Sequence, residues 1–298
     1  MDKETLSNYG WIVICTLVLA VMIALATPFG EYIKAGVEST VNGLYDVNNK
    51  AMDIVCKENV VSKENETFIP GATFTDGTFL SWEELKSLYP INDTTVSEDA
   101  FYNCDTLKTI VIPEGITTLG LQAFANCPSL TTVVLPKTLT TTADDVFINS
   151  ASITNVHISD LSAFCNIFFD NAFGNPAYYA KKLYLNGELI TELIVPNDVK
   201  LIGDHSFQKS SALTSVKIQS GTTTIGWSAF NGCTNLKTIT IPASVTTFRN
   251  YALSDCSSLK TIHFEGTITQ WNAILKNSDW NTNLNSVQVI CSDGVINI

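Results

Sequence analysis

The stretch Ile225-Gly226-Trp227-Ser228-Ala229-Phe230-Asn231-Gly232-Cys233-Thr234-Asn235-Leu236-Lys237-Thr238-Ile239-Thr240-Ile241-Pro242 is one copy of a unit that recurs along most of the chain. Phenylalanines mark this repeat at intervals of 23 residues, at Phe101, Phe124, Phe147, Phe207 and Phe230 with one longer step between the third and the fourth. A fixed period in the twenties is typical of a solenoid, whose units bury their apolar faces against their neighbours.

Each copy predicts a short strand that follows a turn. The alternation around Ile239 and Ile241 places these two side chains inward and the intervening threonines outward, and Pro242 ends the strand. The Ala229-Phe230 pair is expected in a short helical turn, with the phenylalanine inside the coil and stacked on those of neighbouring copies. The predicted fold is therefore mainly β with short helical turns, an α/β solenoid of 23-residue units.

The keyed residues of this unit resemble the BspA-type leucine-rich repeat, whose motif is close to Ile-Gly-x-x-Ala-Phe-x-x-Cys-x-x-Leu-x-x-Ile-x-Ile-Pro. The resemblance covers about 91–265, and the copy at 137–159 departs from it because Thr142-Ala143 replaces Ile-Gly and Ser159 replaces Pro. That family occurs in surface proteins of bacteria and some parasitic protists. The resemblance implies a leucine-rich repeat array that is displayed outside the cell.

The array is predicted over 91–265, with an insertion-bearing unit at 160–196. Within the insertion, Asn186-Gly187 indicates the tight turn of a hairpin. The unit is expected to be one coil that carries extra residues, after which the register resumes.

Both ends of the array need a cap, because an open solenoid end exposes a strand edge. Residues 59–90 are expected to hold a linker and the N-terminal cap, in which Ser81 and Glu84 form the capping box of a short helix. Residues 266–298 are expected to form the C-terminal cap, whose apolar residues cover the last coil: Ile268, Trp271, Ile274 and Leu275.

The N-terminal region predicts a membrane segment. A short tail at 1–10 precedes an apolar run at 11–29, which approaches the length of about 17–20 residues that crosses a bilayer. A transmembrane or signal-anchor helix is favoured, and a cleaved signal peptide stays open because Ala24-Leu25-Ala26 has the small-x-small cleavage pattern. Residues 30–58 have helical spacing and predict a stalk helix.

Composition excludes some classes of partner. The chain has 298 residues, a net charge of −12 and one arginine, Arg249, so it lacks the basic clusters that nucleic acids require. The eight cysteines include four at one repeat position: Cys104, Cys127, Cys233 and Cys256. We interpret these as small buried residues, and disulfides between adjacent coils stay open.

No catalytic or cofactor-binding constellation stands out, and the chain is interpreted as non-enzymatic. His157 and His263 are placed on one outward column four coils apart, roughly 19 Å at the usual strand spacing, which is too far to share a metal ion. His205 is expected in a turn on another face. Neither a metal nor a cofactor is predicted.

The candidate binding surface consists of outward strand positions, which leucine-rich repeat proteins generally use for partners. Two columns are predicted: Thr109, Thr132, Asn155, Glu192, Ser215, Thr238 and Thr261, and beside them Val111, Val134, His157, Ile194, Lys217, Thr240 and His263. The aromatic residues of the insertion form a second candidate patch: Phe173, Tyr178 and Tyr179. A merely solvated sheet face, and aromatic residues that merely pack on the hairpin, are the alternatives.

The favoured function is a cell-surface module for protein–protein interaction or adhesion, membrane-anchored with its repeats outside the cell, or secreted if the N-terminal segment is removed. Its partner is expected to be a host, matrix or other cell-surface protein, or a glycan. The alternative is a structural subunit of a pilus-like or envelope assembly that the N-terminal helix drives.

Overall fold

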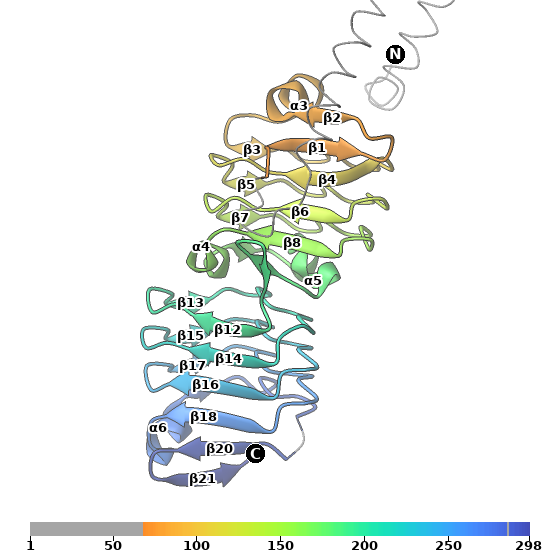
Figure 1. Cartoon of the computed structure of the whole chain (residues 1–298). Coiled ribbons are helices and arrows are strands. Elements are labelled where there is room, and N and C mark those ends of the chain that lie inside the picture. The colour runs from red at the N-terminus through yellow and green to blue at the C-terminus, as the bar shows by residue number, and fades with distance from the viewer. Residues whose placement is uncertain (1–67, 285) are drawn as a thin grey trace, which may run out of the picture. The chain divides into compact units, whose positions relative to one another are not determined.

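The computed structural model describes residues 68–284 and 286–298, which form a solenoid of stacked coils (Figure 1). Two sheets follow one another along one face, and we call them the first and second front sheets. The first has the order β11-β10-β8-β6-β4-β1-β2 and the second β12-β14-β16-β18-β20-β21. Their strands are β1 (Gly71–Phe74), β2 (Phe79–Ser81), β4 (Leu107–Val111), β6 (Thr132–Val134), β8 (Asn155–Ile158), β10 (Tyr184–Leu185), β11 (Glu188–Leu189), β12 (Glu192–Val195), β14 (Ser215–Ile218), β16 (Thr238–Pro242), β18 (Thr261–Glu265), β20 (Gln288–Cys291) and β21 (Gly294–Asn297).

Shorter strands stack on another side of the coils in two side sheets. The first side sheet has the order β3-β5-β7-β9 and the second β13-β15-β17-β19. Their strands are β3 (Thr95–Val96), β5 (Thr118–Leu119), β7 (Thr141–Thr142), β9 (Phe168–Phe169), β13 (Leu201–Ile202), β15 (Thr224–Ile225), β17 (Thr247–Phe248) and β19 (Leu275–Lys276). The pairs between coils are parallel and in register, so Thr109 faces Thr132 and Thr238 faces Thr261.

The phenylalanines of successive copies stack inside the coils, as predicted. Ring centroids lie 5.0 Å apart for Phe101 and Phe124, and 5.4 Å apart both for Phe124 and Phe147 and for Phe207 and Phe230, with the planes within 9° of parallel. All five side chains are buried. Offset stacking of this kind adds to the free energy of apolar burial, so each ring stabilises the coil on either side.

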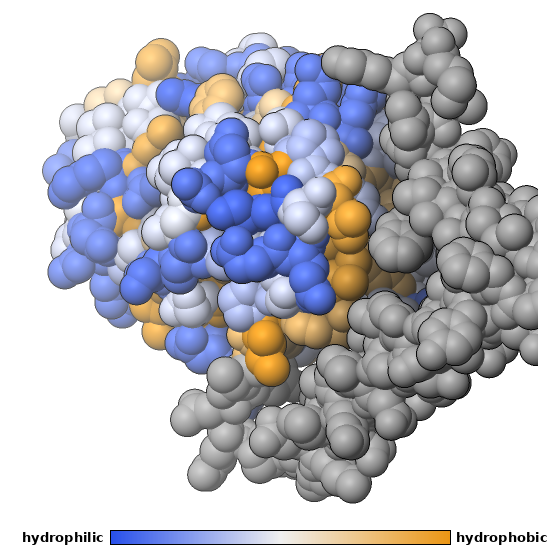
Figure 2. Space-filling model, turned by 90° about the horizontal axis from the view of Figure 1, so that it is seen from above, coloured by the Kyte–Doolittle hydropathy of each residue, from blue (hydrophilic) through white to orange (hydrophobic). Residues whose placement is uncertain are grey.

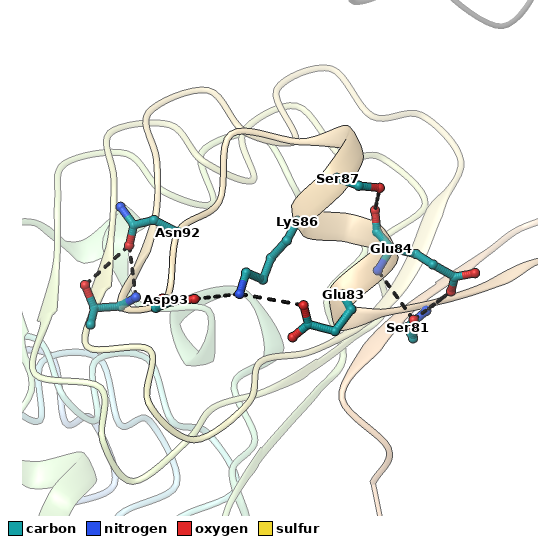
Figure 3. Close-up of polar contacts among 8 residues, drawn as sticks. Ser81, Glu83, Glu84, Lys86, Ser87, Asn92 and Asp93 are labelled. Carbon is teal, nitrogen blue, oxygen red and sulfur yellow. Dashed lines mark hydrogen bonds and ion pairs between the residues drawn. The ribbon is translucent and has the colours of Figure 1, made fainter.

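The N-terminal cap begins with β1, which pairs antiparallel with β4 and with β2. Helix α3 (Trp82–Leu88) follows, and Ser81 and Glu84 form the predicted capping box. Lys86 joins the helix to the first coil through Asp93 at 2.6 Å and also lies 3.7 Å from Glu83 (Figure 3). Seen from this end, the described surface is mostly hydrophilic, as a cap requires (Figure 2).

The insertion holds three short helical elements together with short strands. Its helices are α4 (Leu161–Cys165), the 3-10 helix η1 (Ala172–Gly174) and α5 (Ala177–Ala180), followed by the β10–β11 hairpin with the predicted turn at Asn186-Gly187. Both residues of that turn have positive φ, at 50° and 84°, which favours Asn and Gly. The hairpin was therefore predicted correctly.

The 23-residue register resumes after the insertion, as predicted, but the front sheet does not continue across it. Tyr184 of β10 pairs with His157 of β8, whereas Glu192 of β12 begins the second front sheet. The phenylalanine stack is interrupted at the same place. The amide of Phe147 bonds to the carbonyl of Phe173, as that of Phe124 bonds to Val146, so Gly174 takes the position of the next phenylalanine and supplies no ring.

Isolated contacts join the two halves of the solenoid where the sheets stop. The buried amide of Asn175 donates to the carbonyls of His205 and Ser206, at 3.0 and 2.9 Å. Phe164 of α4 packs edge-on against Phe207, with centroids 5.7 Å apart. These contacts replace the strand pairing that the insertion interrupts.

The C-terminal cap consists of α6 (Ile268–Ala273) and the β20–β21 hairpin. Trp271 and Ile274 are buried against the last coil as predicted. Leu275 is 63% exposed, and its expected role in the cap was wrong because it belongs to β19, the outer strand of the second side sheet.

The expected membrane and stalk helices at 11–29 and 30–58 lie outside the described residues. Within the described part of the chain, none of the helices has the length and apolar character that a membrane span requires.

Removing one ring from the stack tests its contribution to stability. Phe230→Ala is expected to lower the free energy of unfolding by about 3–5 kcal/mol, because it deletes a fully buried aromatic side chain and leaves a cavity. Urea denaturation followed by circular dichroism measures this change. Phe168→Ala is the matched control, since Phe168 is 55% exposed, and it is expected to change stability by less than about 0.5 kcal/mol. Similar losses for both variants would contradict the stack's role.

Candidate partner-binding surface

The outward strand positions are divided between the two front sheets. Thr109, Thr132 and Asn155 stand side by side in the first, and Glu192, Ser215, Thr238 and Thr261 in the second. The second column divides in the same way, into Val111, Val134 and His157, and Ile194, Lys217, Thr240 and His263. The expectation that His157 and His263 share one column was wrong, because the insertion ends one sheet and begins another.

The two front sheets present different surfaces. In the second, Ile194 is 55% exposed, and Glu192, Lys217 and His263 are exposed as well. In the first, Val111 is only 8% exposed, so its assignment as an open outward residue was wrong. Val111 instead lines a groove whose rim includes Phe68 and Pro70, which precede β1.

This groove has a volume of about 280 Å³. It follows the ends of β4, β6 and β8 on the first front sheet. Its lining is largely apolar, with a proline at the end of two strands: Phe68, Pro70, Val111, Ile112, Pro113, Glu114, Val134, Leu135, Pro136, His157, Ile158, Ser159, Asn186 and Gly187. The hairpin turn bounds it on the side of the insertion.

Aromatic rings fix one wall of the groove. The ring of His157 lies 4.8 Å from Phe68 and 4.8 Å from Tyr184, and it is stacked with the tyrosine at 17°. The one carboxylate in the lining, Glu114, accepts the backbone amides of Lys137 and Thr138 at 3.2 Å each. The groove is thus an apolar and aromatic hollow whose acidic group is already hydrogen-bonded.

The aromatic residues of the insertion pack against one another and against neighbouring coils. Phe173 and Tyr178 lie 5.3 Å apart, and Tyr178 and Tyr179 also 5.3 Å. Lys209 donates to the Tyr178 hydroxyl at 2.6 Å, and the amide of Asn149 donates to the Tyr179 hydroxyl at 3.1 Å. These three aromatic side chains are half-buried, which favours a role in joining the coils on either side of the insertion.

The repeat cysteines are free thiols that tie one coil to the previous one. Cys127 donates to the carbonyl of Phe101 at 3.2 Å, and Cys233 and Cys256 donate to those of Phe207 and Phe230 at 3.1 Å each. Ser150, at the equivalent position, makes the same bond to Phe124 at 2.8 Å. Burial raises the pKa of Cys127 to about 12, so the thiol stays protonated.

A metal centre is not assembled in the described residues, where no three His, Cys, Asp or Glu side chains come together. A hydroxyl replaces the thiol at Ser150 and keeps its bond, so the position requires a small hydrogen-bond donor rather than a metal ligand. Ser210 occupies the same position beside the insertion, where the repeat is broken, and its hydroxyl has no partner among the described residues.

The family model of the BspA type leucine rich repeat region matches six copies over residues 53–176 and 179–297. The chain belongs to this family. The two matched blocks meet within the insertion, close to the place where the front sheets separate. The fold and the repeat motif therefore agree with the resemblance seen in the keyed residues.

Several solved leucine-rich repeat structures are similar to the chain. The T. pallidum leucine-rich repeat protein has 22% identity, covers 56% of this chain and 71% of its own, and gives a TM-score of 0.39. The pneumococcal vaccine antigen PcpA has 16% identity, covers 67% and 66%, and gives 0.36. A protein from Bacteroides ovatus has 15% identity, covers 76% and 71%, and gives 0.34. No curated protein matches the chain.

The groove was missed from the sequence because two of its boundaries come from outside the repeat. Phe68 and Pro70 reach it only because β1 adds to the first front sheet antiparallel to β4, and Asn186 reaches it only because β10 joins β8. The alternation in Gly71-Ala72-Thr73-Phe74 was the available signal for an added strand.

Replacing one repeat cysteine by serine tests whether thiol burial makes stability depend on pH. The pKa of Cys127 is raised from an ordinary value of 9.0 to about 12, so its contribution is complete below pH 9 and is lost as the pH rises through 12. Cys127→Ser keeps the donor that Ser150 exemplifies and removes the titrating group. We expect near-native stability at pH 7 and a shallower loss between pH 9 and 12, measured by urea unfolding. Tyr89 also has a pKa raised to about 12, but it is present in both proteins and so contributes the same pH dependence to each. If stability falls equally steeply with pH in the variant and the wild type, Cys127 is not the source of the dependence.

Proposed function

We propose that this protein is a non-catalytic interaction module on the cell surface, which binds a partner protein through the groove on its first front sheet. Residues 11–29 anchor it to the membrane, and the repeats face outward. The groove carries the proposal, because it is a largely apolar hollow of about 280 Å³ on the front of the solenoid. Membership of the BspA-type leucine-rich repeat family supports an interaction role.

The residues that line the groove are suited to binding an apolar side chain of a partner protein rather than to catalysing a reaction. A hollow of this volume accepts one or two apolar or aromatic side chains, which commonly supply the largest share of binding energy at protein interfaces. The ring of His157 is held by stacking, and the oxygens of Glu114 are bonded to backbone amides. These polar groups orient the lining rather than activate a nucleophile.

The acidic character of the chain bears on the choice of partner. With a net charge of −12, the protein attracts basic surfaces over distances of about a Debye length and repels acidic ones. We therefore expect the partner to present an apolar anchor beside a neutral or basic rim. Host, matrix and other cell-surface proteins are the partners proposed.

Introducing a charge into the groove tests the site. For any partner that the wild-type protein binds, Val134→Glu is expected to weaken binding at least about tenfold, because it places a charged side chain in the apolar hollow. Binding of the purified protein to a panel of extracellular-matrix and cell-surface proteins is measured by biolayer interferometry. Ile194→Glu is the matched control, because it makes the same kind of change at the equivalent position of the second front sheet. Equal losses, or loss only with Ile194→Glu, would place the binding site elsewhere.

The proposed topology is tested on intact cells that express the chain. Added protease is expected to remove an epitope placed after Ile298, while a cytoplasmic reference protein stays uncut. The membrane fraction is then expected to retain an N-terminal fragment that includes residues 11–29. Protection of the C-terminal epitope until the cells are lysed would contradict the outward orientation.

A further inference from the structure

A chain of hydrogen-bonded polar side chains runs along the second half of the solenoid. The His205 Nδ1 and Gln208 Oε1 atoms lie 2.8 Å apart, and Gln208 Nε2 donates to Asn231 at 3.2 Å. Asn231 donates in turn to Asp255 at 3.3 Å, and Asn283 donates to the other oxygen of Asp255 at 2.7 Å. We call these five residues the polar strip; it crosses successive coils in the direction of the solenoid axis.

A half-exposed tryptophan stands beside the strip. Trp227 follows β15 of the second side sheet and is 50% exposed, whereas Trp82, Trp271 and Trp280 are buried in the caps. Its ring centroid lies 6.1 Å from that of His205. An exposed tryptophan ring offers a flat apolar face to a ligand, together with one N–H donor at its edge.

Two fixed contacts hold the coil on which this ring stands. The amide of Trp227 donates to Asp204 at 2.7 Å, and Arg249 places Nη1 at 3.0 Å from both oxygens of the same carboxylate. The arginine and the aspartate come from the coils on either side of Trp227. The backbone that carries the indole is therefore tied to both neighbours before any ligand arrives, which lowers the entropy lost on binding.

We propose that Trp227 and the polar strip bind a neutral, extended polysaccharide, such as a β-1,4-linked glucan or its N-acetylated equivalent. The C–H face of a pyranose ring stacks on the indole, and its hydroxyls exchange hydrogen bonds with the amide of Gln208 and donate to the amide oxygen of Asn231. Gln208 uses one of its two donor hydrogens and one of its two acceptor lone pairs within the strip. Asn231 donates both of its hydrogens, to Ser254 at 3.4 Å and to Asp255 at 3.3 Å, so only its oxygen has a free lone pair. This site is independent of the groove on the first front sheet.

The spacing of the coils favours an extended polymer. Neighbouring coils are separated by the strand spacing of about 4.8 Å, which is close to the advance of one β-1,4-linked pyranose ring. A polysaccharide lying along the strip therefore meets about one coil per sugar. Coiled polysaccharides such as amylose do not keep this alignment.

Charge selects a neutral polymer over an anionic one. The chain carries a net charge of −12, and Asp255 lies within the strip itself. The nearby guanidinium of Arg249 is already paired with Asp204. A polyuronate or sulfated glycan would be repelled by this surface, and this repulsion separates the proposal from general polyanion binding.

This proposal is tested by titrating the full chain with cellohexaose and with chitohexaose. Binding is measured by tryptophan fluorescence and by calorimetry. We expect at least one of the two oligosaccharides to bind with a blue shift in emission, because the sugar shields Trp227 from water. Trp227→Ala is expected to weaken binding at least about tenfold and to abolish the shift. Asn231→Ala is expected to weaken binding without removing the indole, and it also serves as the test variant if Trp227→Ala does not fold.

Matched controls locate the site. Tyr102→Ala removes an exposed aromatic ring, 41% exposed, from the first half of the solenoid and is expected to leave binding unchanged. Val134→Glu in the groove is likewise expected to have no effect. The proposal is overturned if neither oligosaccharide binds, if binding survives both Trp227→Ala and Asn231→Ala, or if trigalacturonate binds more tightly than the neutral sugars.

Discussion

The contact between the buried ring of one coil and the ring of the next is the constraint on which the rest of this structure depends. A single repeat cannot hide its phenylalanine, leucine and isoleucine side chains, so each coil is stable only against its neighbours. Burial of Phe124 between Phe101 and Phe147 fixes the separation of three coils at once. Parallel strand pairing then brings equivalent side chains into columns, and the outward columns become the surface available for recognition.

The insertion divides this regular array into two surfaces of different character. Gly174 interrupts the stack of phenylalanine rings, and the front and side sheets end and begin again at the insertion. In place of a strand ladder, Asn175 makes two side-chain hydrogen bonds to the second half. The first half carries the apolar groove beside the N-terminal cap. The second half carries exposed polar columns, together with Trp227 and its hydrogen-bonded neighbours. One repeat motif thus presents two chemically distinct faces, because its variable positions differ on either side of the insertion.

The sequence predicted the features that depend on local periodicity. The 23-residue register, the inward Ile239 and Ile241, the capping box at Ser81 and the turn at Asn186-Gly187 all follow from residue types at fixed spacing, and the structure confirms them. It could not predict which strands pair across an irregular segment. The columns were therefore drawn through Glu192 and Ile194, although Tyr184 is the neighbour of His157. The groove was missed for the same reason, since Phe68 reaches it only through long-range pairing.

The junction at the insertion also has a mechanical consequence. Within each half, ladders of backbone hydrogen bonds on two sides of the coil share a load, whereas Asn175 and a few single contacts such as Gly203 to Cys165 span the junction. Isolated hydrogen bonds rupture one after another under force, whereas the hydrogen bonds of a strand ladder must rupture at the same time and therefore resist a larger force. A pull that separates the two ends of the solenoid is thus expected to part the coils there first, while the strand ladders within each half stay intact.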